Sequence, residues 1–163
     1  MSSLQEKLGD YVEDALAMEQ GVLRMLDEMI GQIDDGQIRG EFERHREETT
    51  RHEQRLRERL DAMGRGSSTV KELGGVVTAL LKGMADIPKT DKPKRFARDA
   101  YATEHMEIAA YELLERFARR AGDEATVVVA RDNRADEEAM ARRIGERWDR
   151  FVDLTIAEEH LMV

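Results

Sequence analysis

Four polar residues interrupt the apolar face of a long helix that we predict over residues 37–63. His45, Glu48, Thr49 and His52 are spaced by three and four residues, so they share the helix face that is apolar on either side of them. Burying an unpaired carboxylate or imidazole costs on the order of ~2–7 kcal/mol. The polar interruption therefore indicates that these side chains meet a ligand or charged partners inside the fold.

Each of the other three long predicted helices carries acidic residues at a comparable level. They are Glu19 on the first helix, Glu104 and Glu107 on the third, and Glu137 or Glu138 on the fourth. Carboxylates from four helices, together with a histidine, are what a pair of divalent metal ions requires inside a helical bundle. The sequence therefore predicts a dimetal site, with Glu137 and Glu138 as alternative ligands from the fourth helix.

The spacing on the 37–63 helix favours particular ligands. Glu48 and His52 are one turn apart and can point at the same ion, with the carboxylate able to bridge two ions. We expect His52 to be a ligand, and His45 to be a packed histidine or one that lies behind the ligands. Ligation rich in carboxylates suits iron or manganese better than copper.

An alternative interpretation needs no metal. Arg131, Arg134 and Arg142 lie on the same predicted helix as Glu137 and Glu138. Ion pairs with these arginines would neutralise inward carboxylates, and the protein would then be a non-catalytic helical dimer.

The composition restricts the class of protein. Of 163 residues, 40% are hydrophobic and 37% charged, which suits helices with charged outer faces. The chain has no cysteine, so disulfides, thiolate zinc sites and cysteine nucleophiles are excluded. The net charge of -9 argues against nucleic-acid and anionic-membrane partners. No apolar run is long enough to span a membrane and residues 1–10 lack a secretory signal pattern, so we expect a cytoplasmic protein.

Apolar periodicity predicts one all-α domain over residues 1–163. The expected helices cover about residues 4–33, 37–63, 69–85, 94–121 and 124–157. Ser3 with Glu6 forms a capping box at the first helix, and Asp123 is the expected cap of the last. The connection over 64–93 is much longer than a helical hairpin needs. This pattern predicts a ferritin-like four-helix bundle with one long crossover connection that carries a short extra helix.

The chain resembles the YciE/YciF family of ferritin-like bacterial stress proteins over about residues 4–151. The resemblance is carried by four segments, most specifically the third: 18–29, 45–49, 104–111 (Glu-His-Met-Glu-Ile-Ala-Ala-Tyr) and 136–138. It implies a ferritin-like subunit, commonly a homodimer, with a ferroxidase-like dimetal site.

The resemblance also implies a set of ligands. Carried over position by position, they are Glu19, Glu48, His52, Glu107 and Glu138, with Glu104 as a further candidate. Arg142 stands where the family often has an acidic residue. On this hypothesis two Fe ions, bridged by Glu48 and Glu138, react with O2 or peroxide in a stress response. The alternative enzyme is a dimanganese protein that disproportionates peroxide.

Overall fold

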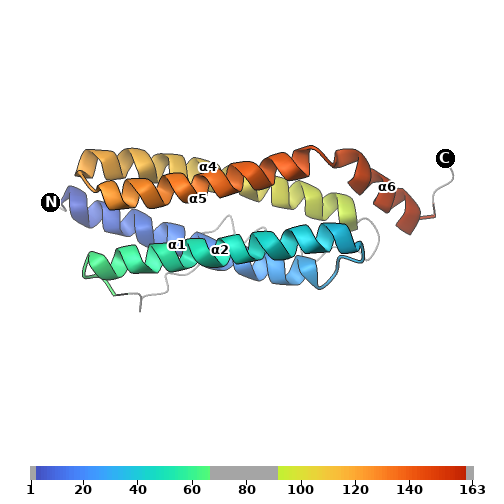
Figure 1. Ribbon diagram of the computed structural model, residues 1–163, viewed down its shortest axis with the longest axis horizontal. Helices are drawn as coiled ribbons and strands as arrows, with labels where there is room; N and C mark the ends of the chain where they lie inside the picture. The colour runs from blue at the N-terminus through green and yellow to red at the C-terminus, as the bar shows by residue number, and fades with distance from the viewer. Residues whose placement is uncertain (1–2, 67–91, 161–163) are drawn as a thin grey trace.

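The computed structural model describes residues 3–66 and 92–160, and every regular element in these ranges is an α-helix (Figure 1). The helices are α1 (Leu4–Ile30), α2 (Gly36–Ala62), α4 (Lys92–Ala121), α5 (Glu124–Gly145) and α6 (Trp148–Glu158). The all-α prediction is confirmed. The helix expected over 69–85 lies outside the described residues. None of the described helices is both long enough and apolar enough to cross a membrane.

Local sequence signals begin the helices where they were predicted. The Ser3 hydroxyl accepts the backbone N–H of Glu6, whose carboxylate accepts the Ser3 N–H, so the predicted capping box is confirmed. Asp123 accepts the backbone N–H of Thr126 at the start of α5, which confirms the second cap. Gly122 precedes it with a φ of 70°, a left-handed conformation that glycine adopts without steric cost.

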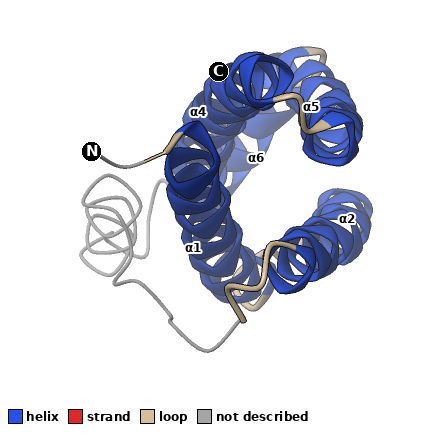
Figure 2. Ribbon diagram, turned by 90° about the vertical axis from the view of Figure 1, so that its left-hand side faces the viewer, coloured by secondary structure: helices blue, strands red, loops and turns tan. Residues whose placement is uncertain are grey.

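The four long helices form two antiparallel hairpins, α1–α2 and α4–α5, packed side by side (Figure 2). Helix α1 contacts α2 and α4, and α5 contacts α4 and α2. The end of α2 lies at one end of the bundle with the start of α1, whereas α4 begins at the opposite end (Figure 1). The chain therefore passes from one end of the bundle to the other between α2 and α4, as a single-crossover bundle requires.

The hydrophobic core has two parts, one toward each end of the bundle. One part gathers the end of α1, the start of α2 and the start of α4 around residues such as Met25, Phe42 and Phe96. The other gathers the start of α1, the end of α2 and the end of α4 around Leu8, Leu56 and Tyr111. Between the two parts lies a layer of buried polar side chains, so the fold places charge where a bundle normally has apolar packing.

The last predicted helix, 124–157, is wrong as one continuous element. Helix α5 ends at Gly145, and Arg147 leaves helical geometry with φ of -128° and ψ of 19° before α6 begins. Gly145 has low intrinsic helix propensity, so ending the helix there costs little free energy. The change of direction brings Phe151 onto the core beside Phe96, where it is 4% exposed. Burial of this aromatic ring accounts for the bend, which hydrophobic periodicity alone does not encode.

Candidate metal centre

Six titratable side chains meet in the polar layer, and each is fully buried. They are Glu19 from α1, His45 and His52 from α2, Glu104 and Glu107 from α4, and Glu137 from α5. All four long helices therefore contribute to one cluster at the middle of the bundle. Buried charged residues are rare unless they are paired or bind a metal, so the cluster calls for one of these explanations.

The donor atoms fall into two groups that share one residue. His45, Glu104, Glu107 and Glu137 form the first group, and Glu19, His52 and Glu137 form the second; within each group the atoms lie within 4.8 Å of one another. Glu137 belongs to both groups. This is the arrangement expected when one carboxylate bridges two neighbouring ions.

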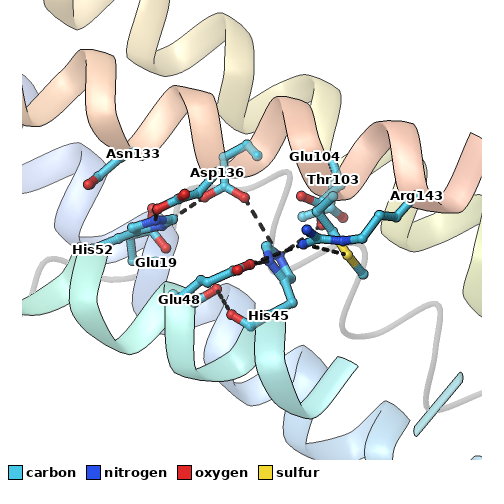
Figure 3. Close-up of polar contacts among 12 residues, drawn as sticks. Glu19, His45, Glu48, His52, Thr103, Glu104, Asn133, Asp136 and Arg143 are labelled. Carbon is cyan, nitrogen blue, oxygen red and sulfur yellow. Dashed lines mark hydrogen bonds and ion pairs between the residues drawn. The ribbon is translucent and has the colours of Figure 1, made fainter. Parts of the chain in front are cut away.

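The two oxygens of Glu137 face different histidines. Oε1 lies 2.8 Å from Nδ1 of His52, and Oε2 lies 3.6 Å from Nε2 of His45. A second carboxylate lies near the same nitrogen of each ring, with Glu19 Oε1 3.5 Å from Nδ1 of His52 and Glu104 Oε1 3.1 Å from Nε2 of His45. Figure 3 shows both histidines projecting from α2 toward the acids of the neighbouring helices.

Most donor atoms of the cluster have no hydrogen bond of good geometry among the described residues, although the inward histidine nitrogens lie within 3.6 Å of carboxylate oxygens. These atoms are both carboxylate oxygens of Glu104, Glu107 and Glu137, Oε2 of Glu19, Nε2 of His45 and Nδ1 of His52. Leaving a charged group buried without partners costs more than the roughly 1–3 kcal/mol of a neutral one. Oxygen and nitrogen atoms that converge in this way from four helices could hold a divalent metal ion.

Burial raises the pKa of the clustered carboxyl groups. It is the largest cause for Glu19, Glu107 and Glu137, and repulsion between neighbouring carboxylates adds to it. The pKa of Glu137 reaches about 7, and that of Glu107 lies well above the usual 4.5. Without a cation, the cluster therefore retains protons on groups that are normally ionised at neutral pH.

The carboxylates in turn raise the pKa of both histidines. Burial alone lowers the pKa of His45, but the charge of Glu104 and hydrogen bonds to Glu104 and Glu48 outweigh it and raise the value well above 6.5. For His52, hydrogen bonds to Glu137 and Glu19 outweigh burial and raise the pKa to about 10. A metal ion must therefore displace protons from the inward nitrogens before it can bind there.

Tyr111 and Asn133 support the Glu19 side of the cluster. The buried Tyr111 hydroxyl donates to Glu19 Oε1 and accepts from Asn133 Nδ2 at 2.9 Å. Asn133 in turn accepts from Arg55 at 2.8 Å. Burial, followed by the negative charge of Glu19, raises the pKa of Tyr111 well above 10, so the phenol remains a donor. The hydroxyl donates to one oxygen of Glu19, and the other oxygen has no hydrogen bond among the described residues.

The structure brings together five of the seven ligands predicted from sequence, namely Glu19, His52, Glu104, Glu107 and Glu137, and separates the other two. Glu138 lies on the outer surface, with its side chain 49% exposed and paired with Arg134. Glu48 lies at the edge of the cluster, where it contacts His45 and Arg143. Glu137 is therefore the residue that belongs to both groups of donor atoms, and neither Glu48 nor Glu138 belongs to either group.

His45 is the residue whose place in the cluster the sequence did not predict. Seven residues separate it from His52, so the two side chains differ by only about 20° around the helix axis, whereas Glu48 is turned about 60° from His45. The seven-residue repeat was thus a better signal than the one-turn spacing of Glu48 and His52.

Two of the three arginines that could neutralise the cluster, Arg131 and Arg134, pair with other acids. Arg134 pairs with Glu112, Glu115 and Glu138, and Arg131 pairs with Glu115. Within residues 3–66 and 92–160, no ion pair joins an arginine to Glu19, Glu104, Glu107 or Glu137. Arginine neutralisation therefore does not account for the four buried carboxylates.

Comparisons with known proteins give one matching family model and several similar structures. The family model described as "Domain of unknown function (DUF892)" matches residues 3–157. A crystal structure of a protein from Xanthomonas campestris is 27% identical, covers 98% of this chain and 100% of its own, and has a TM-score of 0.83.

Two more distant structures show likeness of fold alone, each at 18% identity. The Escherichia coli stress protein YciF has a TM-score of 0.79 over 94% of this chain and 99% of its own. A structure described as ferritin like, diiron-carboxylate proteins from Bacillus anthracis has a TM-score of 0.74 over 91% of this chain and 99% of its own. The ferritin-like fold predicted from sequence is confirmed.

Proposed function

This chain belongs to the family described as a domain of unknown function (DUF892), and we propose that its buried cluster holds two iron ions and acts as a ferroxidase-like centre. The resemblance predicted from sequence is confirmed at the level of this family. The activity proposed here rests on the site itself, because one fold serves many functions.

The observation that carries the proposal is the set of unsatisfied donor atoms around Glu137. Glu137 belongs to two groups of donor atoms, and each group also contains a histidine and at least one further carboxylate. Four ionised carboxylates carry a charge of -4, which two divalent cations balance when the histidines are neutral. In the metal-free protein, protons on the histidines and on the carboxyl groups of raised pKa take the place of this positive charge.

The ligands divide between the two ions. His45, Glu104 and Glu107 would hold one ion, Glu19 and His52 the other, and Glu137 both. When bound, iron supplies the electrons that reduce O2 or peroxide. The chain excludes bulk water through its two apolar core clusters, and Tyr111 orients Glu19 by donating to one of its oxygens.

Manganese is the alternative metal. The same oxygen-rich donor set suits Mn(II), and the second candidate activity is therefore peroxide disproportionation at a dimanganese centre. The fold shared with a structure described as a diiron-carboxylate protein favours iron, and the fold shared with a stress protein supports a role in a stress response. A homodimer in the cytoplasm remains part of the proposal.

Metal titration of the purified protein tests this function. We expect close to two Fe(II) ions per chain under anaerobic conditions, a rise in the melting temperature, and O2 consumption on exposure to air. Gas release from peroxide after loading with Mn(II), without O2 uptake after loading with Fe(II), would favour the manganese enzyme. Absence of both binding and thermal stabilisation would reject a dimetal function.

A further inference from the structure

Each buried histidine has a second carboxylate on the side that faces away from the cluster. Nδ1 of His45 lies 3.3 Å from Oε2 of Glu48, and Nε2 of His52 lies 3.0 Å from Oδ2 of Asp136. These outer acids are 20% and 37% exposed, respectively, whereas the rings are fully buried. The two rings therefore turn different nitrogen atoms toward the outside.

The contacts of Glu48 decide which nitrogen of His45 keeps its hydrogen. Arg143 donates to Oε2 of Glu48 at 3.1 Å, the same oxygen that faces the imidazole (Figure 3). An ionised carboxylate only accepts hydrogen bonds, so Nδ1 of His45 must be the donor. A neutral His45 then has its lone pair on Nε2, the atom that faces Glu104 and Glu137.

His52 has the opposite arrangement. Its Nε2 atom donates to Asp136, so a neutral ring has its lone pair on Nδ1. That atom faces Glu19 and Glu137 inside the cluster. Two histidines on one face of α2 thus present different ring nitrogens to the same shared carboxylate.

We propose that the two histidines bind metal through opposite ring nitrogens, His45 through Nε2 and His52 through Nδ1. Glu48 is the positioning residue that holds the His45 ring with Nε2 toward the metal. The proposal rests on the metal-binding function argued above. Glu48 performs its role from behind the ring and does not bind the ion. Arg143 extends from α5, the helix that also carries Glu137, and so ties the orientation of His45 to the helix of the bridging ligand.

Nitrogen-15 NMR of the zinc-loaded, histidine-labelled protein tests the orientation, because Zn(II) is diamagnetic and accepts nitrogen and oxygen ligands. We expect zinc to shift Nε2 of His45 while Nδ1 keeps its proton, and to shift Nδ1 of His52 while Nε2 keeps its proton. The exposed His105 serves as the internal reference.

The possible results separate the two proposals. Zinc bound to His45 through Nδ1, or a change confined to His52, would overturn the inference and leave the metal centre standing. No zinc-dependent change in either ring would overturn both.

Substitutions at Glu48 test the positioning role. Glu48→Gln keeps an oxygen acceptor for the His45 N–H, and we expect its zinc affinity to stay within about threefold of the wild type. Glu48→Leu removes the acceptor, and we expect a loss of about 10–100-fold, the usual effect of removing a group that orients a metal-binding histidine. Glu47→Leu, on the exposed face of the same helix, is the matched control. Wild-type affinity and unchanged His45 spectra in Glu48→Leu would contradict the role.

Discussion

Glu137 and His52, on helices α5 and α2, place a carboxylate oxygen and a ring nitrogen 2.8 Å apart in the fully buried middle of the bundle. The second oxygen of the same carboxylate faces the other buried histidine. One residue of α5 thus connects both halves of the cluster, and changes at Glu137 should affect both proposed ions together.

Glu137→Gln should abolish metal-dependent stabilisation. The amide keeps the shape of the side chain but removes the charge that two cations share. We expect the rise in melting temperature on adding Fe(II) or Mn(II) to disappear, as measured by differential scanning fluorimetry. Glu138→Gln is the matched control, because Glu138 follows Glu137 in the sequence but its carboxylate lies on the surface and pairs with Arg134. Equal loss in both variants would assign the effect to the general acidity of α5.

Neutralising Glu107 should make the metal-free protein more stable. Burial raises the pKa of this carboxyl group, and the charges of Glu137, Glu19 and Glu104 raise it further, so its ionised form is costly. We expect Glu107→Gln to raise the apo melting temperature at pH 8 by at least about 2 °C, the shift that roughly 1 kcal/mol gives in a domain of this size.

Glu115 provides the contrast for this variant. Hydrogen bonds from Arg119 and Arg131 lower its pKa, so the ionised form is favoured. Glu115→Gln should therefore lower or leave unchanged the melting temperature. A loss of stability in Glu107→Gln would show that the Glu107 carboxylate stabilises the fold and is not kept there to bind a metal ion.

The metal-free protein should lose stability as the pH rises. His52 has a folded-state pKa of about 10 against an ordinary 6.5. Its contribution to the free energy of unfolding is therefore complete below pH 6.5 and is lost as the pH rises through 10. Glu137 has a folded-state pKa of about 7 against 4.5, so its contribution is lost between these values. Both groups bind protons more tightly in the folded state, so both make the protein less stable as the pH rises.

Urea denaturation of the apo protein at pH 6 and pH 9 measures this effect. Metal binding should show the reverse trend, with affinity rising with pH, because the ions displace protons from the histidines. Greater apo stability at pH 9 than at pH 6 would contradict the pKa directions of the cluster.

The Tyr111 hydroxyl should contribute measurably to stability. Tyr111→Phe leaves Glu19 Oε1 and the Asn133 amide without this partner in a buried site, and such losses cost about 1–3 kcal/mol of unfolding free energy. Urea denaturation measures the difference. Tyr101→Phe is the control, because its half-buried ring packs against Trp148 and His105; an equal loss in both variants would show that the buried hydrogen bonds are not the cause.

Most of the fold follows from local signals in the sequence. Apolar periodicity locates three of the long helices and the start of the fourth to within a few residues, and Ser3 and Asp123 cap two of them as expected. The break after Gly145 does not follow, because it depends on burying Phe151 against residues far away in the chain. A tertiary contact of this kind overrides a continuous helical pattern.

The candidate site was predicted at the level of helices more reliably than at the level of side chains. Glu137 and Glu138 are adjacent, and the sequence offers similar apolar neighbours for either. In the structure Glu137 is fully buried, whereas Glu138 lies on the surface and pairs with Arg134. His45 and Glu48 differ by about 60° around α2, and in the fold His45 is fully buried in the cluster whereas Glu48 lies at its edge beside Arg143.

An anomalous-difference map at the iron edge, from crystals loaded with Fe(II) without oxygen, tests the dimetal centre most directly. We predict two peaks about 3.5–4 Å apart, one beside His45 and one beside His52, with the carboxylate of Glu137 between them. A map without peaks in this cluster, or with iron bound only at surface carboxylates, would contradict the proposed centre.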